Sequence, residues 1–309
     1  TCSFLTNFMN QTLTSCIQTE SYVYHIESDR FQSGNLLFTD WSALKTTDGN
    51  STTVIAGNAS QPAYREGIGE NARFTFIKSF VQTTDNETIL SDTGIACLRH
   101  VDRISEEVST YAGMCDKPSP EQFSGLFAII IDQKDLNRIL ATDSVSIKSV
   151  DTLTRNISTL YRGELRLRHM LQNTTSGDIY VTFDHGIALL NYTGNILMIL
   201  AGSTSKGLRD GDFGKVQFNE PEEIISLSAD LLLLADSRNQ KLRLLNLRTK
   251  QSCISVCSGT SGSMNGNLTS CQLSVPRSLF KVNNTLYIGQ NRYIREIGGK
   301  SLITTFIHY

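Results

Sequence analysis

Leu233-Leu234-Ala235-Asp236 is a short apolar run that ends in an aspartate, and runs of the same kind recur along the chain. The other copies are Leu36-Leu37-Phe38-Thr39-Asp40, Thr88-Ile89-Leu90-Ser91-Asp92, Arg138-Ile139-Leu140-Ala141-Thr142-Asp143, Ile179-Tyr180-Val181-Thr182-Phe183-Asp184 and, with glycine in the last position, Leu286-Tyr287-Ile288-Gly289. The intervals between successive copies are 52, 51, 41, 52 and 53 residues. A repeat of about 40 to 50 residues built from short apolar runs is typical of β-propeller blades.

Each repeat has the same internal order. An apolar stretch precedes the Asp-ended run, an alternating segment follows it, and a fourth run often ends in Ala-Gly, as in Ile199-Leu200-Ala201-Gly202. Four strands per repeat and six repeats predict an all-β fold, a six-bladed β-propeller with four antiparallel strands per blade. The predicted organisation is one domain over 1–309, with an N-terminal segment at 1–17 and blades at about 18–57, 58–113, 114–161, 162–202, 203–259 and 260–309.

Composition excludes several classes of protein. With 39% hydrophobic residues the 309-residue chain can bury a large core, and its net charge of −2 argues against a nucleic-acid partner. No run approaches the roughly 18 to 20 apolar residues of a membrane helix, so we expect no direct membrane insertion of this segment. Thr1 is not an initiating Met and no signal-peptide pattern follows it, so we expect a processed chain or an excised ectodomain whose anchor lies outside it.

Asn-x-Ser/Thr sequons indicate glycosylation. The chain has roughly twice as many as its Asn, Ser and Thr content gives by chance. The nine sequons are at Asn10, Asn50, Asn58, Asn86, Asn156, Asn173, Asn191, Asn267 and Asn283. Most lie in Ser/Thr/Gly-rich stretches typical of loops, where a bulky glycan can be carried. We therefore predict a glycoprotein of the secretory pathway, extracellular or at the cell surface.

The seven cysteines favour disulfides over a zinc site, because no His lies near Cys253 and Cys257. A hairpin centred near 105–107 would bring Cys97 opposite Cys115. We also expect Cys257 to pair with Cys271, and Cys2 with Cys16. Cys253 is then left over, and an alternative joins it to Cys2 or Cys16.

Two further stretches resemble the NHL-repeat family of propellers. One combines Ala201-Gly202, Arg209-Asp210-Gly211 and Ala235-Asp236-Ser237, and the other combines Ala56-Gly57, Arg65-Glu66-Gly67 and Ser91-Asp92-Thr93. The resemblance covers the whole chain loosely and about half of it specifically. Its motif residues suggest roles in the scaffold. The glycine allows a positive φ, and the Asp that ends the strand accepts hydrogen bonds from backbone N–H groups of the following turn. Phe74, Phe218 and Leu273 would pack between blades.

Members of that family include a peptidyl-amidating lyase with a histidine-rich zinc site at the propeller centre. Of the five histidines here, only His25 and His169 occupy first strands that would line the centre, one short of a three-His site. Glu27, Glu222 and Glu223 supply acidic groups, but no cluster has a calcium-loop spacing. We therefore expect no catalytic residue, no metal ligand and no cofactor. A secreted lyase or hydrolase with zinc or calcium at the centre is the alternative.

Partner recognition is the predicted function. We expect the ectodomain of a cell-surface receptor, or a secreted glycoprotein, that binds an extracellular protein or glycoprotein through propeller loops free of sequons. Tyr64, Arg65 and Arg209 are the predicted partner-binding residues, since Tyr and Arg are enriched at interfaces. The competing interpretation makes them loop-stabilising motif residues. A structural propeller of a matrix or stalk protein is a further alternative.

Overall fold

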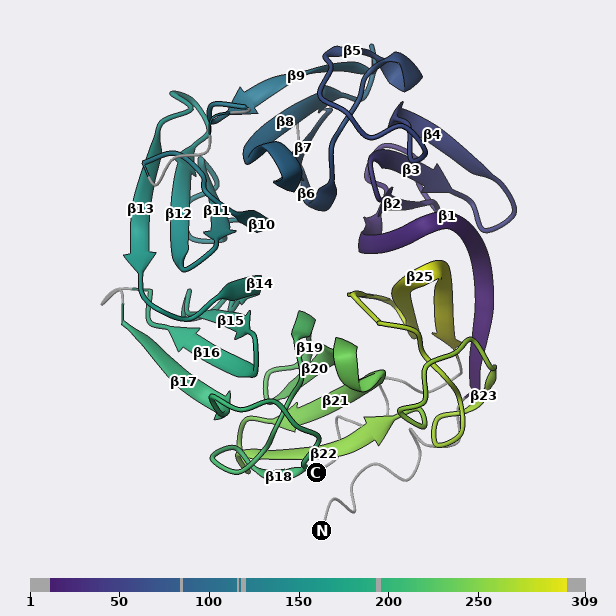
Figure 1. The fold of residues 1–309 in the computed structure, drawn as a ribbon, viewed down its shortest axis with the longest axis vertical. Helices are drawn as coiled ribbons and strands as arrows, with labels where there is room; N and C mark the ends of the chain where they lie inside the picture. The colour runs from purple at the N-terminus through teal and green to yellow at the C-terminus, as the bar shows by residue number, and fades with distance from the viewer. Residues whose placement is uncertain (1–11, 84–85, 116, 118–120, 193–195, 299–309) are drawn as a thin grey trace. The chain divides into compact units, whose positions relative to one another are not determined.

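A computed structural model describes residues 12–83, 86–115, 117, 121–192 and 196–298 (Figure 1). Contacts divide the chain into two compact units. Unit 1 contains the described residues of Thr1–Thr19, Thr182–Ala188 and Met198–Tyr309, and unit 2 contains those of Glu20–Val181 and Leu189–Leu197. Among the described residues, no helix has the length and apolar character that crossing a bilayer requires.

The strands form antiparallel sheets in which the chain moves one strand at a time. One sheet has the order β5-β9-β8-β7-β6, from β5 (Gly67–Ile68), β6 (Ile77–Gln82), β7 (Glu87–Asp92), β8 (Cys97–Asp102) and β9 (Glu107–Ala112). A second sheet contains, in order, β10 (Leu126–Ile131), β11 (Arg138–Asp143), β12 (Ser146–Asp151) and β13 (Ile157–Arg162). A third contains, in order, β14 (Leu167–Gln172), β15 (Ile179–Phe183), β16 (Gly186–Leu190) and β17 (Leu197–Gly202). Another has the order β18-β22-β21-β20-β19, from β18 (Gly211–Asp212), β19 (Pro221–Ser228), β20 (Leu231–Asp236), β21 (Lys241–Asn246) and β22 (Gln251–Val256).

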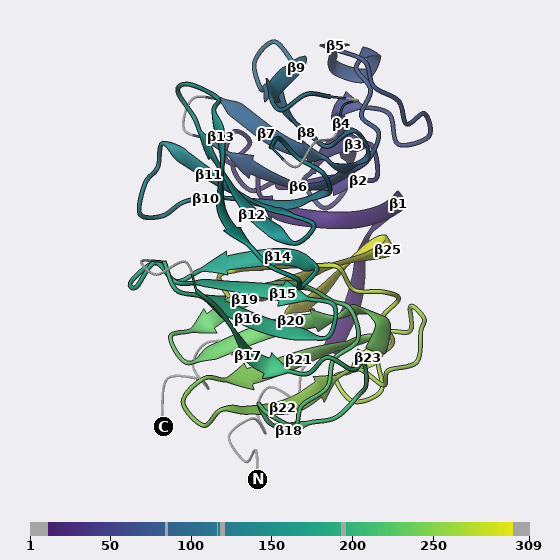
Figure 2. The ribbon, with the colours of Figure 1, turned by 60° about the vertical axis from the view of Figure 1, so that its left-hand side comes forward.

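Such sheets are propeller blades, and the predicted class, an all-β propeller with four antiparallel strands per blade, is confirmed. Within unit 2, β6 packs against β10 and β10 against β14, so that first strands of successive blades lie side by side, as Figure 2 also shows for β10 and β14. Within unit 1, β19 packs against β24 (Ser278–Val282) in the same way.

The predicted count of six blades is wrong, because the described residues form five sheets. The fifth has seven strands, in the order β24-β25-β1-β2-β3-β4 with β23 (Gly266–Asn267) paired to β1. Its other members are β1 (Thr12–Ser28), β2 (Leu36–Asp40), β3 (Ala43–Thr47), β4 (Thr52–Gly57) and β25 (Thr285–Gly298).

Two long strands explain the difference. The N-terminal segment was predicted at 1–17, but its described end from Thr12 continues into the first strand as a single 17-residue β1. Its start pairs with β23 at Leu13 and Gly266, and its end pairs with β2 at Ser28 and Leu36. In the last repeat the expected second and third strands are one 14-residue strand, β25.

Burial follows the position of a strand within its blade. Every residue of β20 is buried, which explains its uninterrupted apolar run. The outer strands β13 and β17 are largely exposed or half-buried. In unit 2, Phe74 is fully buried in a cluster that joins Leu37 and Leu44 of one blade to Phe80 and Leu90 of the next. Phe74 therefore packs between blades, as predicted.

The motif residues hold the scaffold. Gly57 has a φ of 86°, and a Cβ there would lie 2.4 Å from the Ser42 carbonyl oxygen, so only glycine fits. The aspartates that end the second strands β2, β7, β11 and β20 accept backbone N–H groups, but not from the following turn as predicted. Asp92 accepts from Phe76 at 3.0 Å, and Asp236 accepts from Asn219 at 2.8 Å. Both donors precede the first strand of the same blade, so the carboxylate fixes where the chain enters that blade.

Two predicted disulfides are confirmed among the described residues. Cys97 pairs with Cys115 across a Cα–Cα distance of 5.2 Å, and Cys257 pairs with Cys271 across 4.6 Å. The predicted Cys2–Cys16 pair involves Cys2, which lies outside the described residues, and the side chains of Cys16 and Cys253 are not described either.

Candidate functional site: two loop edges and a histidine pair

The sequons of unit 2 gather at one edge of its blades. In an antiparallel blade the connections between strands one and two and between strands three and four lie at the same edge. Contacts join these connections across blades: Arg103 Nη2 lies 2.9 Å from Asp29 Oδ2, and Gln172 Nε2 lies 2.9 Å from Asp132 Oδ1. We call this edge of unit 2 the sequon edge.

Five of the six sequons in unit 2 lie at the sequon edge. They are Asn50, Asn86, Asn156, Asn173 and Asn191, and the sixth, Asn58, follows β4 at the opposite edge. Asn267 and Asn283 are exposed residues of unit 1, and Asn10 lies outside the described residues. Glycans at the five sites would shield the sequon edge, whereas the opposite edge would carry a single glycan, at Asn58, whose carbonyl accepts a hydrogen bond from Ser42 Oγ at 2.8 Å.

A cavity of about 510 Å³ opens at the sequon edge between two blades of unit 2. Its lining includes Arg30, Glu87, Tyr111, Leu153 and Arg155. The guanidinium of Arg155 lies 3.7 Å from the centre of the Tyr111 ring. Burial raises the pKa of the Tyr111 hydroxyl, and this effect is larger than the lowering of the pKa by the positive charge of Arg155. The sequons at Asn86 and Asn156 directly adjoin Glu87 and Arg155, so their glycans would cover this cavity.

The opposite edge of unit 2 carries half-buried aromatic side chains. Tyr22, Tyr24, Trp41 and Phe76 form a group that we call the aromatic row. Trp41 stacks on Phe76 with ring centroids 4.5 Å apart, and Tyr24 meets the edge of Phe76 at 4.7 Å. Lys78 Nζ lies 5.3 Å from the Phe76 centroid, which adds a cation beside the row. Aromatic side chains are enriched in the cores of protein interfaces.

Trp41 occupies an unfavourable backbone conformation. It sits in the two-residue turn between β2 and β3, closed by the pairing of Asp40 with Ala43, and its φ is 57°. Glycine and asparagine are the residues that adopt this left-handed conformation readily, and a bulky residue there costs about 1–2 kcal/mol. Ser144 has the same conformation, with a φ of 54° in the equivalent turn between β11 and β12, so the turn requires it and a large aromatic side chain is tolerated there at Trp41.

The predicted partner-binding residues make scaffold contacts. Tyr64 is 40% exposed, but the Arg99 guanidinium stacks on its ring at 4.8 Å. Arg65 Nε donates to the Asn71 carbonyl at 2.7 Å. Arg209, in unit 1, pairs with Gln217 through backbone atoms and has an exposed side chain. These contacts favour the loop-stabilising interpretation. The sequence pattern did not predict the aromatic row, because its members come from separate strands and turns.

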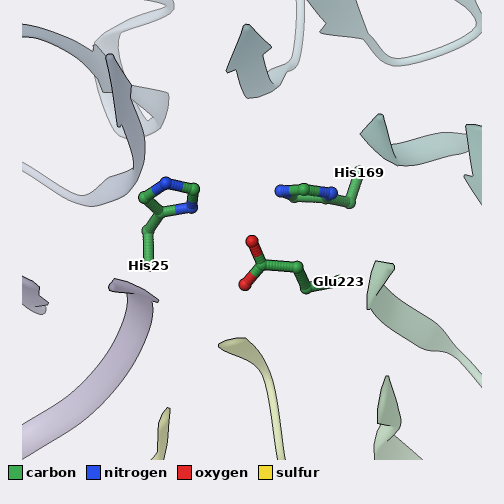
Figure 3. A group of neighbouring side chains, drawn as sticks. All are labelled: His25, His169 and Glu223. Atoms are coloured by element: carbon green, nitrogen blue, oxygen red, sulfur yellow. The ribbon is translucent and has the colours of Figure 1, made fainter. Parts of the chain in front are cut away.

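Two of the histidines, His25 and His169, lie on the first strands of their blades. His25 on β1 and His169 on β14 both belong to unit 2, and their ring centroids lie 6.0 Å apart with 27° between the ring planes (Figure 3). His25 is buried and its Nε2 lies 3.4 Å from Glu27 Oε1. Glu223, also labelled in Figure 3, belongs to unit 1, where its Oε2 accepts a hydrogen bond from the Leu279 N–H at 2.7 Å. Glu222, also in unit 1, lies 3.3 Å from Arg277.

The other histidines are placed elsewhere. His100 on β8 lies 3.1 Å from Glu87 through its Nε2. His185 is a half-buried residue of unit 1, and His308 lies outside the described residues.

Comparison with known proteins supports the fold and leaves function open. No family model and no curated protein matches the chain. Two solved structures of auxiliary nutrient binding proteins are similar in fold. The one from Bacteroides thetaiotaomicron is 13% identical, with a TM-score of 0.74 over 94% of this chain and 76% of that chain. The one from Bacteroides ovatus is 14% identical, with a TM-score of 0.73 over 95% of this chain and 78% of that chain. A chain in the crystal structure of a nidogen/laminin complex is 14% identical, with a TM-score of 0.56 over 82% of this chain and 84% of that one. At these identities the similarity shows a shared fold alone.

Proposed function

We propose that the chain is an extracellular binding module that recognises a protein partner through the aromatic row of unit 2. The observation that carries the proposal is Trp41, a half-buried aromatic residue of the aromatic row, in a left-handed turn at the edge that is poor in sequons. Tyr and Trp dominate the binding energy of protein interfaces, and such residues cluster at their centres. Large glycans at the sequon edge would direct a partner to the opposite edge.

An extracellular location agrees with two disulfides, which persist in oxidising compartments. Solved structures of similar fold include the extracellular domain of a two-component system protein and a chain of the nidogen/laminin complex. Receptor ectodomain, secretion, glycosylation and membership of the NHL-repeat family are parts of this proposal.

A substitution at Trp41 can separate binding from folding. Trp41→Gly relieves the left-handed backbone, worth about 1–2 kcal/mol, but removes the ring contacts with Tyr22, Tyr24 and Phe76 and their buried surface, so thermal unfolding of the variant is measured beside its binding. Ser144→Gly is the matched control, because Ser144 has a φ of 54° in the equivalent turn between β11 and β12. Leu153→Ala, at the sequon edge and 77% exposed, is the second control.

The assay is binding of the tetramerised chain to a panel of purified extracellular domains. We expect a partner bound by the wild type, Ser144→Gly and Leu153→Ala, with at least tenfold weaker binding by Trp41→Gly and by Tyr24→Ala. Equal binding by all variants, or loss with Leu153→Ala alone, would place the interface away from the aromatic row.

A further inference from the structure

His25 is held in one orientation by its neighbours in unit 2. Its ring meets the Phe80 ring edge-on with centroids 4.7 Å apart. Glu27 lies two residues further along β1, on the same face of the strand, with Oε1 3.4 Å from His25 Nε2. The other carboxylate oxygen, Oε2, accepts a hydrogen bond from Gln82 Nε2 at 2.8 Å, so Glu27 is itself fixed.

The carboxylate of Glu27 sets the chemistry of this imidazole. A carboxylate beside Nε2 favours the tautomer that carries its proton there, because that N–H donates toward Oε1. Nδ1 then keeps a lone pair and can bind a metal ion. A histidine that binds metal through one nitrogen and donates to a carboxylate through the other is a recurrent arrangement in metalloproteins.

His169 supplies a second imidazole on the same side. One ring nitrogen of His25 and one of His169 lie within 4.8 Å of each other, and the two rings point toward one another in Figure 3. Two imidazole ligands of a tetrahedral zinc ion, each about 2.0–2.1 Å from the metal, have nitrogen atoms about 3.3 Å apart. Because Phe80 and Glu27 hold His25 in place, closing the remaining gap requires the His169 ring to move.

We propose that His25 and His169 bind one divalent transition-metal ion, for which Zn²⁺ is the best fit, and that Glu27 orients His25 for it. Imidazole nitrogen suits zinc, copper and nickel, whereas calcium takes six to eight oxygen ligands that this pair does not offer. With two protein ligands in unit 2, coordination positions are left for water or a bound molecule. The proposal does not depend on recognition through the aromatic row.

Zinc binding by the full chain tests the assignment. The purified protein is freed of metal with a chelator and titrated with Zn²⁺ against a competing indicator, and bound metal is counted by mass spectrometry after gel filtration. We expect one zinc per wild-type chain and its loss in His25→Ala and His169→Ala. Glu27→Gln should weaken zinc binding by about 10–100-fold while keeping the stoichiometry.

His100→Ala is the matched control, since His100 also lies next to a carboxylate of unit 2, Glu87, and should leave zinc binding unchanged. Thermal unfolding of each variant reports its folding. His25→Gln and His169→Gln replace any alanine variant that is unfolded, since glutamine keeps a polar side chain of similar length. Co²⁺ absorption bands provide a second readout of coordination. A wild type that binds no zinc, or folded His25 and His169 variants that bind it as the wild type does, would overturn the proposal.

Discussion

The guanidinium of Arg243 donates a hydrogen bond to the carboxylate of Asp236 at 2.8 Å, and both side chains are completely buried in unit 1. Arg243 also donates to Asp210 Oδ1 at 2.6 Å, and Asp236 accepts from the Asn219 N–H. Burial raises the pKa of Asp236, and these hydrogen bonds oppose that effect. The Arg-Asp-Gly loop and the end of the second strand are thus tied together by one buried cation.

Arg243→Met should destabilise the chain by about 3–5 kcal/mol, because it leaves the Asp236 carboxylate buried without its cation. Denaturant unfolding followed by tryptophan fluorescence and circular dichroism measures the change. Arg238→Met is the control: its side chain is 53% exposed and lies 3.4 Å from Glu220, an arrangement worth about 1 kcal/mol or less. Equal losses in the two variants would contradict the structural role of Arg243.

The disulfide between Cys97 and Cys115 should contribute about 2–4 kcal/mol, since it closes a loop in the unfolded chain. The double variant Cys97→Ser/Cys115→Ser should lower the free energy of unfolding by that amount, and reducing agent should no longer affect this loop. Peptide mapping without reduction checks the pairing directly. A peptide that links Cys97 to Cys253 would be incompatible with the register of β8 and β9.

Asp132 should account for part of the acid sensitivity of unit 2. Burial raises its pKa, but hydrogen bonds from Gln172, the Lys134 N–H and Arg138 outweigh burial and lower the pKa below 3.8. A lowered pKa in the folded state stabilises the fold above the unfolded value, and this contribution disappears as pH falls through the folded-state pKa. Asp132→Asn should therefore be less stable at pH 7 and lose less stability between pH 5 and 2.

Melting temperatures measured across that range of pH test this prediction. Asp135→Asn is the control, because Asp135 lies in the same loop and is exposed. A wild type and an Asp132→Asn variant with parallel acid profiles would show that Asp132 does not contribute in this way.

Glycans should be tolerated at the sequon edge, whereas a new glycan next to Phe76 of the aromatic row should block partner binding. In a secretory expression host, Asn86→Gln and Asn156→Gln should each remove one glycan, seen as a loss of mass that glycosidase treatment of the wild type reproduces. Arg73→Asn creates a new sequon with Thr75, three residues before Phe76. We expect this glycan to block partner binding while the natural glycans do not. If Asn86 and Asn156 carry no glycan, the sequon edge is not shielded in the way proposed.

Much of the scaffold was predictable because its determinants are local. The Asp-ended runs at Asp40, Asp92, Asp143 and Asp236 are each the buried second strand of a blade. Hairpin geometry alone placed Cys97 opposite Cys115. The number of blades was not predictable, because it depends on whether consecutive strands are interrupted. β1 and β25 each continue through a stretch where the repeat pattern suggested a break.

The sequence by itself determined the strands, their antiparallel order and two disulfides, since alternation, turn residues and short hairpins act between neighbours in the chain. Only the tertiary structure decided which side chains meet across blades. His25 and His169 come from different blades of unit 2, and their proximity follows from the packing of first strands. Trp41 and Phe76 likewise come from two different blades and meet where the turn between β2 and β3 lies beside the start of β6. Contacts of this kind are set by blade packing, which no local pattern encodes, and both proposed binding features of this protein depend on them.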